Sequence, residues 1–193
     1  MPNVFYITHP EVIVDPHTPV PRWPLSVPGQ LKMAAICQLR EMADVKSVWS
    51  STEQKAQDGR ALMAALLKVE GGELPGLGEN DRSATGYLPE AKFWPVVEKF
   101  FAEPDQSAYG WETARDAQAR CVGAVDEVLE QAPDGDVAII GHGGVGTLLM
   151  CHLLKAEISR DHAAGGMGWW FAFDRESREV TQGWTQPPDR PVT

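Results

Sequence analysis

The feature that most constrains the fold is the stretch 137–150, in which an apolar run ends at a histidine and two glycines and a second apolar segment follows. Residues 137–141 have the β-branched character of a buried strand, and residues 145–150 have the character of a helix. Ligands of an open α/β sheet bind outside the carboxyl ends of its strands, which is where His142 falls. The glycines let a ligand approach the backbone, and the N–H groups of the following helix favour an anion.

A second apolar run, residues 4–9, has the same arrangement near the start of the chain. It ends at His9, and Pro10 stops the strand. If this strand lies beside residues 137–141 and parallel to them, the two histidines meet at one edge of the sheet. We therefore expect His9 and His142 to form the centre of a single site.

Helical and extended segments alternate through the rest of the chain. Apolar spacing predicts helices over four segments: 29–42, 51–68, 89–101 and 111–131. Strands are predicted at 45–49 and, as edge strands, at 169–173 and 179–184. Ser51 and Gln54 have capping-box spacing at the start of the second helix. The alternation predicts one α/β domain over residues 1–185, with three layers (α/β/α) and a mostly parallel central sheet, and a flexible tail over 186–193.

The charge and the cysteines restrict the function and the compartment. The formal net charge of the 193 residues is −10, which disfavours nucleic acid and an anionic membrane surface as partners. No apolar run is long enough to span a bilayer, and no secretory signal is visible at the start. The three cysteines lie far apart, so we expect reduced thiols in a cytoplasmic protein. Histidines and cysteines lack metal-ligand spacing, and Cys151 beside His152 fits a buried helix face better than a metal site.

Residues 141–146 also satisfy the pattern G-x-G-x-x-G, which after a strand and before a helix is the dinucleotide-binding fingerprint. The fingerprint expects an acidic residue about twenty positions later, at the end of a second strand. Glu157 and Asp161 have roughly that spacing but lie in a polar stretch, and a bulky His142 inside the tight turn is unexpected. A dinucleotide binder therefore stays open as a remote alternative.

An ordered set of motifs accounts for more of the chain. Residues 4–154 contain the strand-end His9, the pattern Ser-x-x-x-Lys-Ala at 51–56, the loop acid Glu79 and the strand-end His142-Gly-Gly, in that order. The segment Pro24-Leu-Ser-Val-Pro-Gly29 precedes the first predicted helix. The set resembles the histidine phosphatase superfamily, the phosphoglycerate mutase-like proteins, whose motifs read Arg-His-Gly, Pro-Leu-Thr-x-x-Gly, Ser-x-x-x-Arg-Ala, an acid and His-Gly-Gly. The resemblance implies the phosphoglycerate mutase-like form of the α/β/α fold.

The resemblance also implies a mechanism. His9 takes the position of the nucleophile that becomes phosphorylated, Glu79 that of the general acid and base, and His142 that of a residue that stabilises the transferred group. The phosphoryl oxygens are expected to bind four groups: Thr8, Lys55, Arg82 and the backbone of Gly143. This chemistry needs neither a metal ion nor a cofactor.

Two departures from the family pattern bear on activity. Thr8 stands where the family has an arginine, and Lys55, which lacks the bidentate fork of a guanidinium, replaces a second arginine. Arg82, three residues after Glu79, is the candidate to supply the missing guanidinium.

We expect hydrolysis of a small phosphomonoester, because the chain is shorter than the mutases it resembles and lacks an evident insertion to enclose a bisphosphorylated cofactor. Two alternatives stay open. One is a phosphoglycerate mutase-type phosphotransferase, and the other is a non-catalytic phosphoryl binder that kept the pocket and lost its arginines. The sequence indicates neither the substrate nor the oligomeric state.

Overall fold

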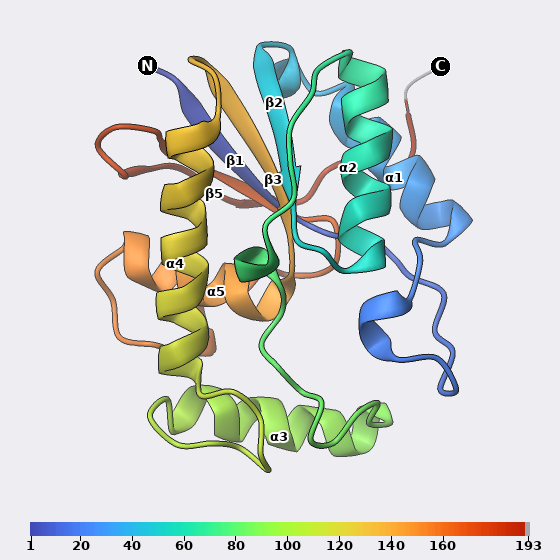
Figure 1. Ribbon diagram of the computed structural model, residues 1–193, viewed down its shortest axis with the longest axis vertical. Coiled ribbons are helices and arrows are strands. Elements are labelled where there is room, and N and C mark those ends of the chain that lie inside the picture. The colour runs from blue at the N-terminus through green and yellow to red at the C-terminus, as the bar shows by residue number, and fades with distance from the viewer. Residues whose placement is uncertain (192–193) are drawn as a thin grey trace.

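Five strands form one mixed sheet in the computed structural model, which describes residues 1–191 (Figure 1). The strands are β1 (Asn3–Thr8), β2 (Val45–Ser50), β3 (Asp136–Gly141), β4 (Trp170–Asp174) and β5 (Val180–Thr185), in the order β2-β3-β1-β4-β5. The α-helices are α1 (Val27–Cys37), α2 (Gln54–Leu67), α3 (Glu90–Ala102), α4 (Ala114–Gln131) and α5 (Gly143–Leu153). Short 3-10 helices lie in the connections at Val20–Arg22, Arg40–Met42, Pro75–Leu77 and Arg160–His162.

The first three strands are parallel, and the last two form an antiparallel hairpin. β1 and β3 are parallel neighbours, and β2 pairs with β3 in the same direction. β4 runs antiparallel to β1, and β5 runs antiparallel to β4, so four of the five strands point the same way. The predicted α/β fold with a mostly parallel sheet is confirmed.

β4 is an internal strand, and its predicted place at an edge is wrong. It lies between β1 and β5, and all of its residues are buried. The run Trp170-Phe-Ala-Phe173 carries apolar side chains toward both faces, which suits a strand covered on both sides better than an edge. β5, whose residues are exposed or half-buried, forms one edge as predicted.

Helices cover both faces of the sheet (Figure 1). On one face, α1 and α2 pack together over Phe5 and Ile7. On the other, α4 and α5 pack over Tyr6 and Ile139. Alternate residues of β1 thus enter opposite cores, as the period of a strand requires. α3 lies beyond the end toward which the parallel strands point (Figure 1). Within residues 1–191, every helix is too short or too polar to cross a membrane.

Two predictions about helix ends are wrong, each for a local reason. The helix predicted over 29–42 begins at Val27 and ends at Cys37, and the chain turns before the 3-10 helix Arg40–Met42. The capping box predicted for Ser51 and Gln54 does not form. α2 begins at Gln54, and its N-cap residue, Glu53, makes no side-chain cap bond. The Ser51 hydroxyl contacts the ring of His142 instead.

The segment that follows β5 lies against α1. Pro187 is buried, and the Asp189 carboxylate pairs with the Lys32 ammonium of α1 at 3.2 Å. Residues 192–193, the end of the predicted flexible tail, lie outside the described residues. The domain limits of 1–185 stay a prediction.

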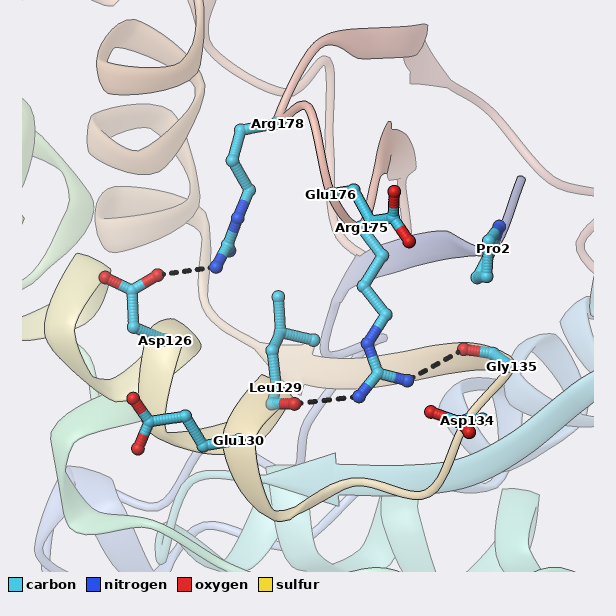
Figure 2. Close-up of a pocket in the computed structure, with 9 residues that line it drawn as sticks. All are labelled: Pro2, Asp126, Leu129, Glu130, Asp134, Gly135, Arg175, Glu176 and Arg178. Carbon is cyan, nitrogen blue, oxygen red and sulfur yellow. Dashed lines mark hydrogen bonds and ion pairs between the residues drawn. The ribbon is translucent and has the colours of Figure 1, made fainter.

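A hollow at the amino ends of β1 and β3 is organised around Arg175, in the turn between β4 and β5 (Figure 2). One guanidinium nitrogen donates to the carbonyl groups of Pro133 and Gly135, at 2.6 and 3.2 Å. The other donates to those of Leu129 and Ala132, at 2.7 and 2.9 Å. A cation here satisfies free carbonyl groups at the end of α4 and opposes the negative end of its dipole. Arg175 therefore ties the hairpin to α4, at the end of the sheet away from the two histidines.

Replacement of Arg175 by alanine is expected to lower the free energy of unfolding by about 2 kcal/mol, because hydrogen bonds from charged donors typically contribute roughly 1.5–3 kcal/mol and water can replace part of the set. Urea denaturation measures the change. Asp126→Asn is the matched control, since it breaks a half-exposed ion pair with Arg178 in the same hollow (Figure 2). Such a pair contributes at most about 1 kcal/mol. Equal losses in the two variants would show that Arg175 does not hold the end of α4.

Candidate active site

The parallel pairing of β1 with β3 brings the two strand-end histidines together. Thr8 pairs with Gly141, and the backbone N–H of His9 donates to the Gly141 carbonyl at 2.9 Å, so the hydrogen bonding continues one residue past the strand. The rings of His9 and His142 lie edge to face, with centroids 5.3 Å apart. The structure thus brings together the two side chains that the apolar runs of the sequence predicted to meet.

The His9 ring is held with one nitrogen bonded to its own chain. Its Nδ1 lies 2.9 Å from the carbonyl oxygen of Pro10, an acceptor, so Nδ1 carries the proton and Nε2 keeps its lone pair. Burial, with smaller contributions from His142 and the Lys55 ammonium, lowers the pKa of His9 to about 3. At neutral pH His9 is therefore an uncharged imidazole with Nε2 available as a nucleophile.

Tyr6 fixes the backbone of the second histidine. Its hydroxyl donates to the His142 carbonyl at 3.1 Å and accepts from the His142 N–H at 2.9 Å. A Cβ on Gly141 would lie 2.1 Å from the Tyr6 oxygen, and one on Gly146 would lie 2.6 Å from a carbon of the ring. Two of the three glycines in the pattern G-x-G-x-x-G thus make room for a tyrosine.

The His142 side chain is fully buried and has one engaged and one unpaired nitrogen. Nε2 lies 2.7 Å from the Ser51 hydroxyl and 3.5 Å from a carboxylate oxygen of Glu53. Nδ1 is buried and has no hydrogen-bond partner within the part of the chain that the structure describes. Burial lowers the pKa of His142, and the carboxylates of Glu53 and Glu79 oppose that shift only in part.

Glu53 was not predicted as a site residue, although it joins several of the residues that were. One of its oxygens lies 2.5 Å from the Lys55 ammonium, and the other accepts from the backbone N–H of Glu79 at 2.9 Å. Lys55, only 4% exposed, also donates to the Val20 carbonyl at 3.0 Å. Burial raises the pKa of Glu53, but His142 and Lys55 lower it more, to about 2. One signal in the sequence could have indicated Glu53. It is an acidic residue inside Ser-x-x-x-Lys-Ala, two positions before Lys55, which was expected to bind phosphoryl oxygens.

Glu79 occupies the amino end of α5, where the sequence predicted an anion. Its carboxylate accepts from the backbone N–H groups of Gly144 and Val145, both at 3.0 Å. A Cβ on Gly144 would lie 2.5 Å from this carboxylate, so the glycine gives Glu79 its access to the helix. Burial raises the pKa of Glu79. Arg82, His142 and the N–H of Gly144 together lower it by more, so the net shift is downward. The Glu79 carboxylate therefore accounts for glycine at position 144.

Arg82 lies beside Glu79 and is held on several sides. Its guanidinium pairs with the Glu79 carboxylate at 3.1 Å and donates to the Asn80 side chain at 2.9 Å. The guanidinium carbon also lies 5.1 Å from the ring centroid of Phe93 in α3 and 4.9 Å from that of Trp111, within cation–π distance. Arg82 therefore belongs to a packed wall of the site between α3 and the start of α5.

The last two predicted phosphate-binding groups, Thr8 and Gly143, differ in their surroundings. The Thr8 hydroxyl is buried and donates to the Trp169 carbonyl at 3.2 Å. Gly143 is the first residue of α5, and a Cβ there would meet nothing within 4 Å. Packing alone therefore does not require glycine at 143. Phosphoryl binding by these two groups stays a prediction.

The charges of the site cancel in pairs. Lys55 is paired with Glu53, and Arg82 with Glu79, while burial lowers the pKa of both imidazoles. The arrangement offers a nucleophilic imidazole nitrogen and two carboxylates that can exchange protons. It also offers two cations that could bind an anion in place of their carboxylate partners. In residues 1–191, no group of three or more histidine, cysteine or acidic side chains has a geometry that could hold a metal ion.

Comparison with known proteins identifies the family of the chain and several similar structures. A family profile for the histidine phosphatase superfamily (branch 1) matches residues 18–165, whereas no curated protein sequence matches the chain. The solved structure of YhfR from Bacillus stearothermophilus is similar with a TM-score of 0.78 and 15% identity, over 93% of this chain and 94% of that one. A mycobacterial glucosyl-3-phosphoglycerate phosphatase, in complex with VO3, is similar with a TM-score of 0.75 and 18% identity, over 90% and 93%. The same phosphatase with inorganic phosphate gives 0.76 and 16%, over 96% of each chain.

His9 is expected to make folding stability depend on pH in a defined window. The pKa of about 3 in the folded protein lies below the value of about 6.5 in the unfolded chain, so between these values the unfolded state binds more protons. The unfolding free energy should therefore fall by about 2 kcal/mol between pH 7 and pH 5 on account of His9 alone. Urea denaturation should show this part of the fall lost in His9→Gln and kept in His152→Gln, which removes an exposed histidine. Parallel curves for wild type and His9→Gln would contradict a lowered pKa of His9 in the folded protein.

Proposed function

The chain belongs to the histidine phosphatase superfamily, and we propose that it is a phosphomonoester hydrolase that acts through a phosphohistidine at His9. The observation that supports this most is the state of the His9 ring. The ring is neutral, and its Nδ1 proton is held by the Pro10 carbonyl. Nε2 has no hydrogen-bond partner among the described residues and lies beside a second histidine. An imidazole of this kind can attack phosphorus at neutral pH.

In the first proposed step, the Nε2 lone pair of His9 attacks phosphorus in line with the leaving oxygen. The P–N bond forms as the P–O bond to the leaving group breaks, and Glu79 gives that oxygen a proton. The Nδ1–H bond to the Pro10 carbonyl stabilises the positive charge that develops on the ring. In the second step a water oxygen attacks phosphorus while Glu79 takes a proton from it. The P–N bond breaks, and inorganic phosphate and neutral His9 are released.

The role of Glu79 requires its carboxyl to be protonated when the substrate is bound. In the structure this group is ionised, because Arg82 and backbone N–H groups hold its pKa down. A dianionic phosphoryl group beside it raises that pKa, since like charge disfavours the carboxylate. Arrival of the substrate also draws Arg82 toward the phosphoryl oxygens, which removes a partner of the carboxylate. Both effects favour the acid form of Glu79 in the complex.

The phosphoryl oxygens are proposed to meet Lys55, Arg82, His142, the Thr8 hydroxyl and the N–H of Gly143. Hydrolysis is favoured over a mutase-type transfer because a structurally similar protein is itself named a phosphatase. The second candidate function is phosphoryl binding without turnover. Two observations favour it: both cations are already paired with carboxylates, and Thr8 turns its hydroxyl to the Trp169 carbonyl.

A phosphoenzyme trap tests the proposal. Acid-labile, base-stable phosphate should label wild-type protein after an acid quench during turnover of p-nitrophenyl phosphate, with a chelator present throughout. His9→Ala should carry no label, because the attacking nitrogen is gone. His152→Ala is the control, since that histidine is exposed on the far part of α5. Label that persists in His9→Ala would reject His9 as the nucleophile, and unlabelled, inactive wild type would favour the binding function.

Glu79→Gln should lower the rate for alkyl phosphates by roughly 10²–10⁴-fold, the usual contribution of a general acid. The loss should be much smaller for p-nitrophenyl phosphate, because nitrophenolate leaves without a proton. Steady-state kinetics on the two esters gives the comparison. Asp81→Asn is the control, since within residues 1–191 that nearby carboxylate bonds only to its own turn. Equal losses on both esters would assign the proton transfer to another group.

A further inference from the structure

Glu53 has contacts that place it between the charged groups of the site. Its carboxylate reaches the Lys55 ammonium, the backbone N–H of Glu79 and, at 3.5 Å, Nε2 of His142. The side chain is only 13% exposed, so these contacts are made largely out of water. A buried carboxylate beside an imidazole stabilises the protonated ring more than a solvated one does.

We propose that Glu53 is a positioning residue that turns His142 into the cation of the phosphoryl-binding site when an anion binds. The inference rests on the proposed function, because it concerns how the same site neutralises a phosphoryl group. It goes further in naming which group supplies the charge, and in requiring that binding take up a proton.

The charge of the empty site is the first step of the argument. Lys55 and Arg82 are each paired with a carboxylate, so a phosphoryl dianion meets no net positive charge. Protonation of Glu79 removes a negative charge but creates no cation, so the groups that can become cationic near neutral pH are the two imidazoles. His9 has to stay unprotonated at Nε2 in order to attack phosphorus. His142 is therefore the group that can supply the missing charge.

The geometry around His142 gives the second step. The Glu53 carboxylate can only accept, and the Ser51 hydroxyl at 2.7 Å can also accept, so both contacts are favourable when the His142 proton sits on Nε2. That leaves Nδ1 as the nitrogen with a lone pair, and it is buried without a partner among the described residues. A buried polar nitrogen in a native protein normally has a partner. A proton taken up at Nδ1 converts it into a charged donor to a phosphoryl oxygen, with Glu53 stabilising the opposite side of the ring.

The charged groups around His142 determine whether its ring is neutral or protonated, before and after an anion binds. They are Glu53 and Lys55 at the start of α2, Glu79 and Arg82 in the loop before α3, and His9 after β1. Burial, Lys55 and Arg82 keep the ring neutral while the site is empty. A bound dianion attracts both cations away from the ring and adds negative charge beside it, which favours the imidazolium. Glu79 is less suited to the role of Glu53, because it is engaged by α5 and Arg82.

Proton uptake on anion binding tests the proposal. Inorganic sulfate is the probe, because it stays a dianion between pH 6 and pH 9. Any proton taken up on binding is therefore taken up by the protein. Calorimetric titrations at pH 8 in two buffers of different ionisation enthalpy give the number of protons taken up per sulfate bound. Wild type should take up about one proton at His142 besides any proton that Glu79 takes up, and each proton taken up should weaken sulfate affinity by up to about tenfold for each further pH unit. The imidazole ¹⁵N spectrum should show Nδ1 of His142 gaining that proton.

Variants test whether proton uptake depends on the Glu53 carboxylate itself or is changed by loss of any nearby carboxylate. Glu53→Gln should bind sulfate with about one proton fewer taken up than wild type and with a flatter pH dependence, whereas Glu53→Asp should keep part of the difference. Glu73→Gln is the matched control, since it removes a carboxylate paired with Arg60 and should leave the uptake unchanged. Wild type that binds sulfate without proton uptake overturns the proposal, even where His9 still becomes phosphorylated. Full uptake in Glu53→Gln overturns the part played by Glu53. Failure of wild type to bind sulfate or phosphate overturns this proposal and the proposed function together.

Discussion

The site depends on the parallel hydrogen bonding between β1 and β3. Both catalytic candidates follow the last paired residues of these strands, and the bond from the His9 N–H to the Gly141 carbonyl fixes the separation of the two chains where the side chains emerge. The backbone of His142 is then held by the Tyr6 hydroxyl, which comes from β1 itself. Each of the two histidines thus directly follows the end of a strand. The placement of the two histidines, on which the proposed attack on phosphorus depends, is therefore part of the sheet.

A second property of the site is that every strong charge has a partner of opposite sign before any ligand binds. Ion pairs of this kind hold side chains in place at some cost to anion affinity, because a phosphoryl group competes with carboxylates that are already bound. Glu53 and Glu79 take the two positions that an anion would otherwise occupy, beside the buried ammonium and at the amino end of α5. If the site binds a phosphoryl group as proposed, such pairing would favour a ligand whose remaining contacts bind it strongly.

Short sequence patterns predicted the features that depend on residues close together in the chain, such as strands and motifs. Apolar runs that end in His9 and His142 were enough to predict parallel strands and a shared site, and the ordered motifs led to the family. They did not predict the role of Glu53, because its partners come from two other segments, at 79 and 142. The packing of Arg82 against Phe93 and Trp111 likewise joins residues that are distant in sequence. The internal position of β4 follows from pairing across the sheet, which a local apolar run does not reveal.

The fit of Tyr6 against two glycines limits the order in which this chain can change during evolution. A methyl group at 141 or 146 collides with the tyrosine while it is present, so substitutions at either glycine are accessible only after position 6 has become smaller. A smaller residue at 6 in turn releases the backbone of His142, on which the site depends. Positions 6, 141 and 146 are thus epistatic, and they should vary together or not at all among descendants of this sequence. A glycine pattern that looks like a nucleotide-binding signature can persist in a lineage because of one aromatic ring on the neighbouring strand.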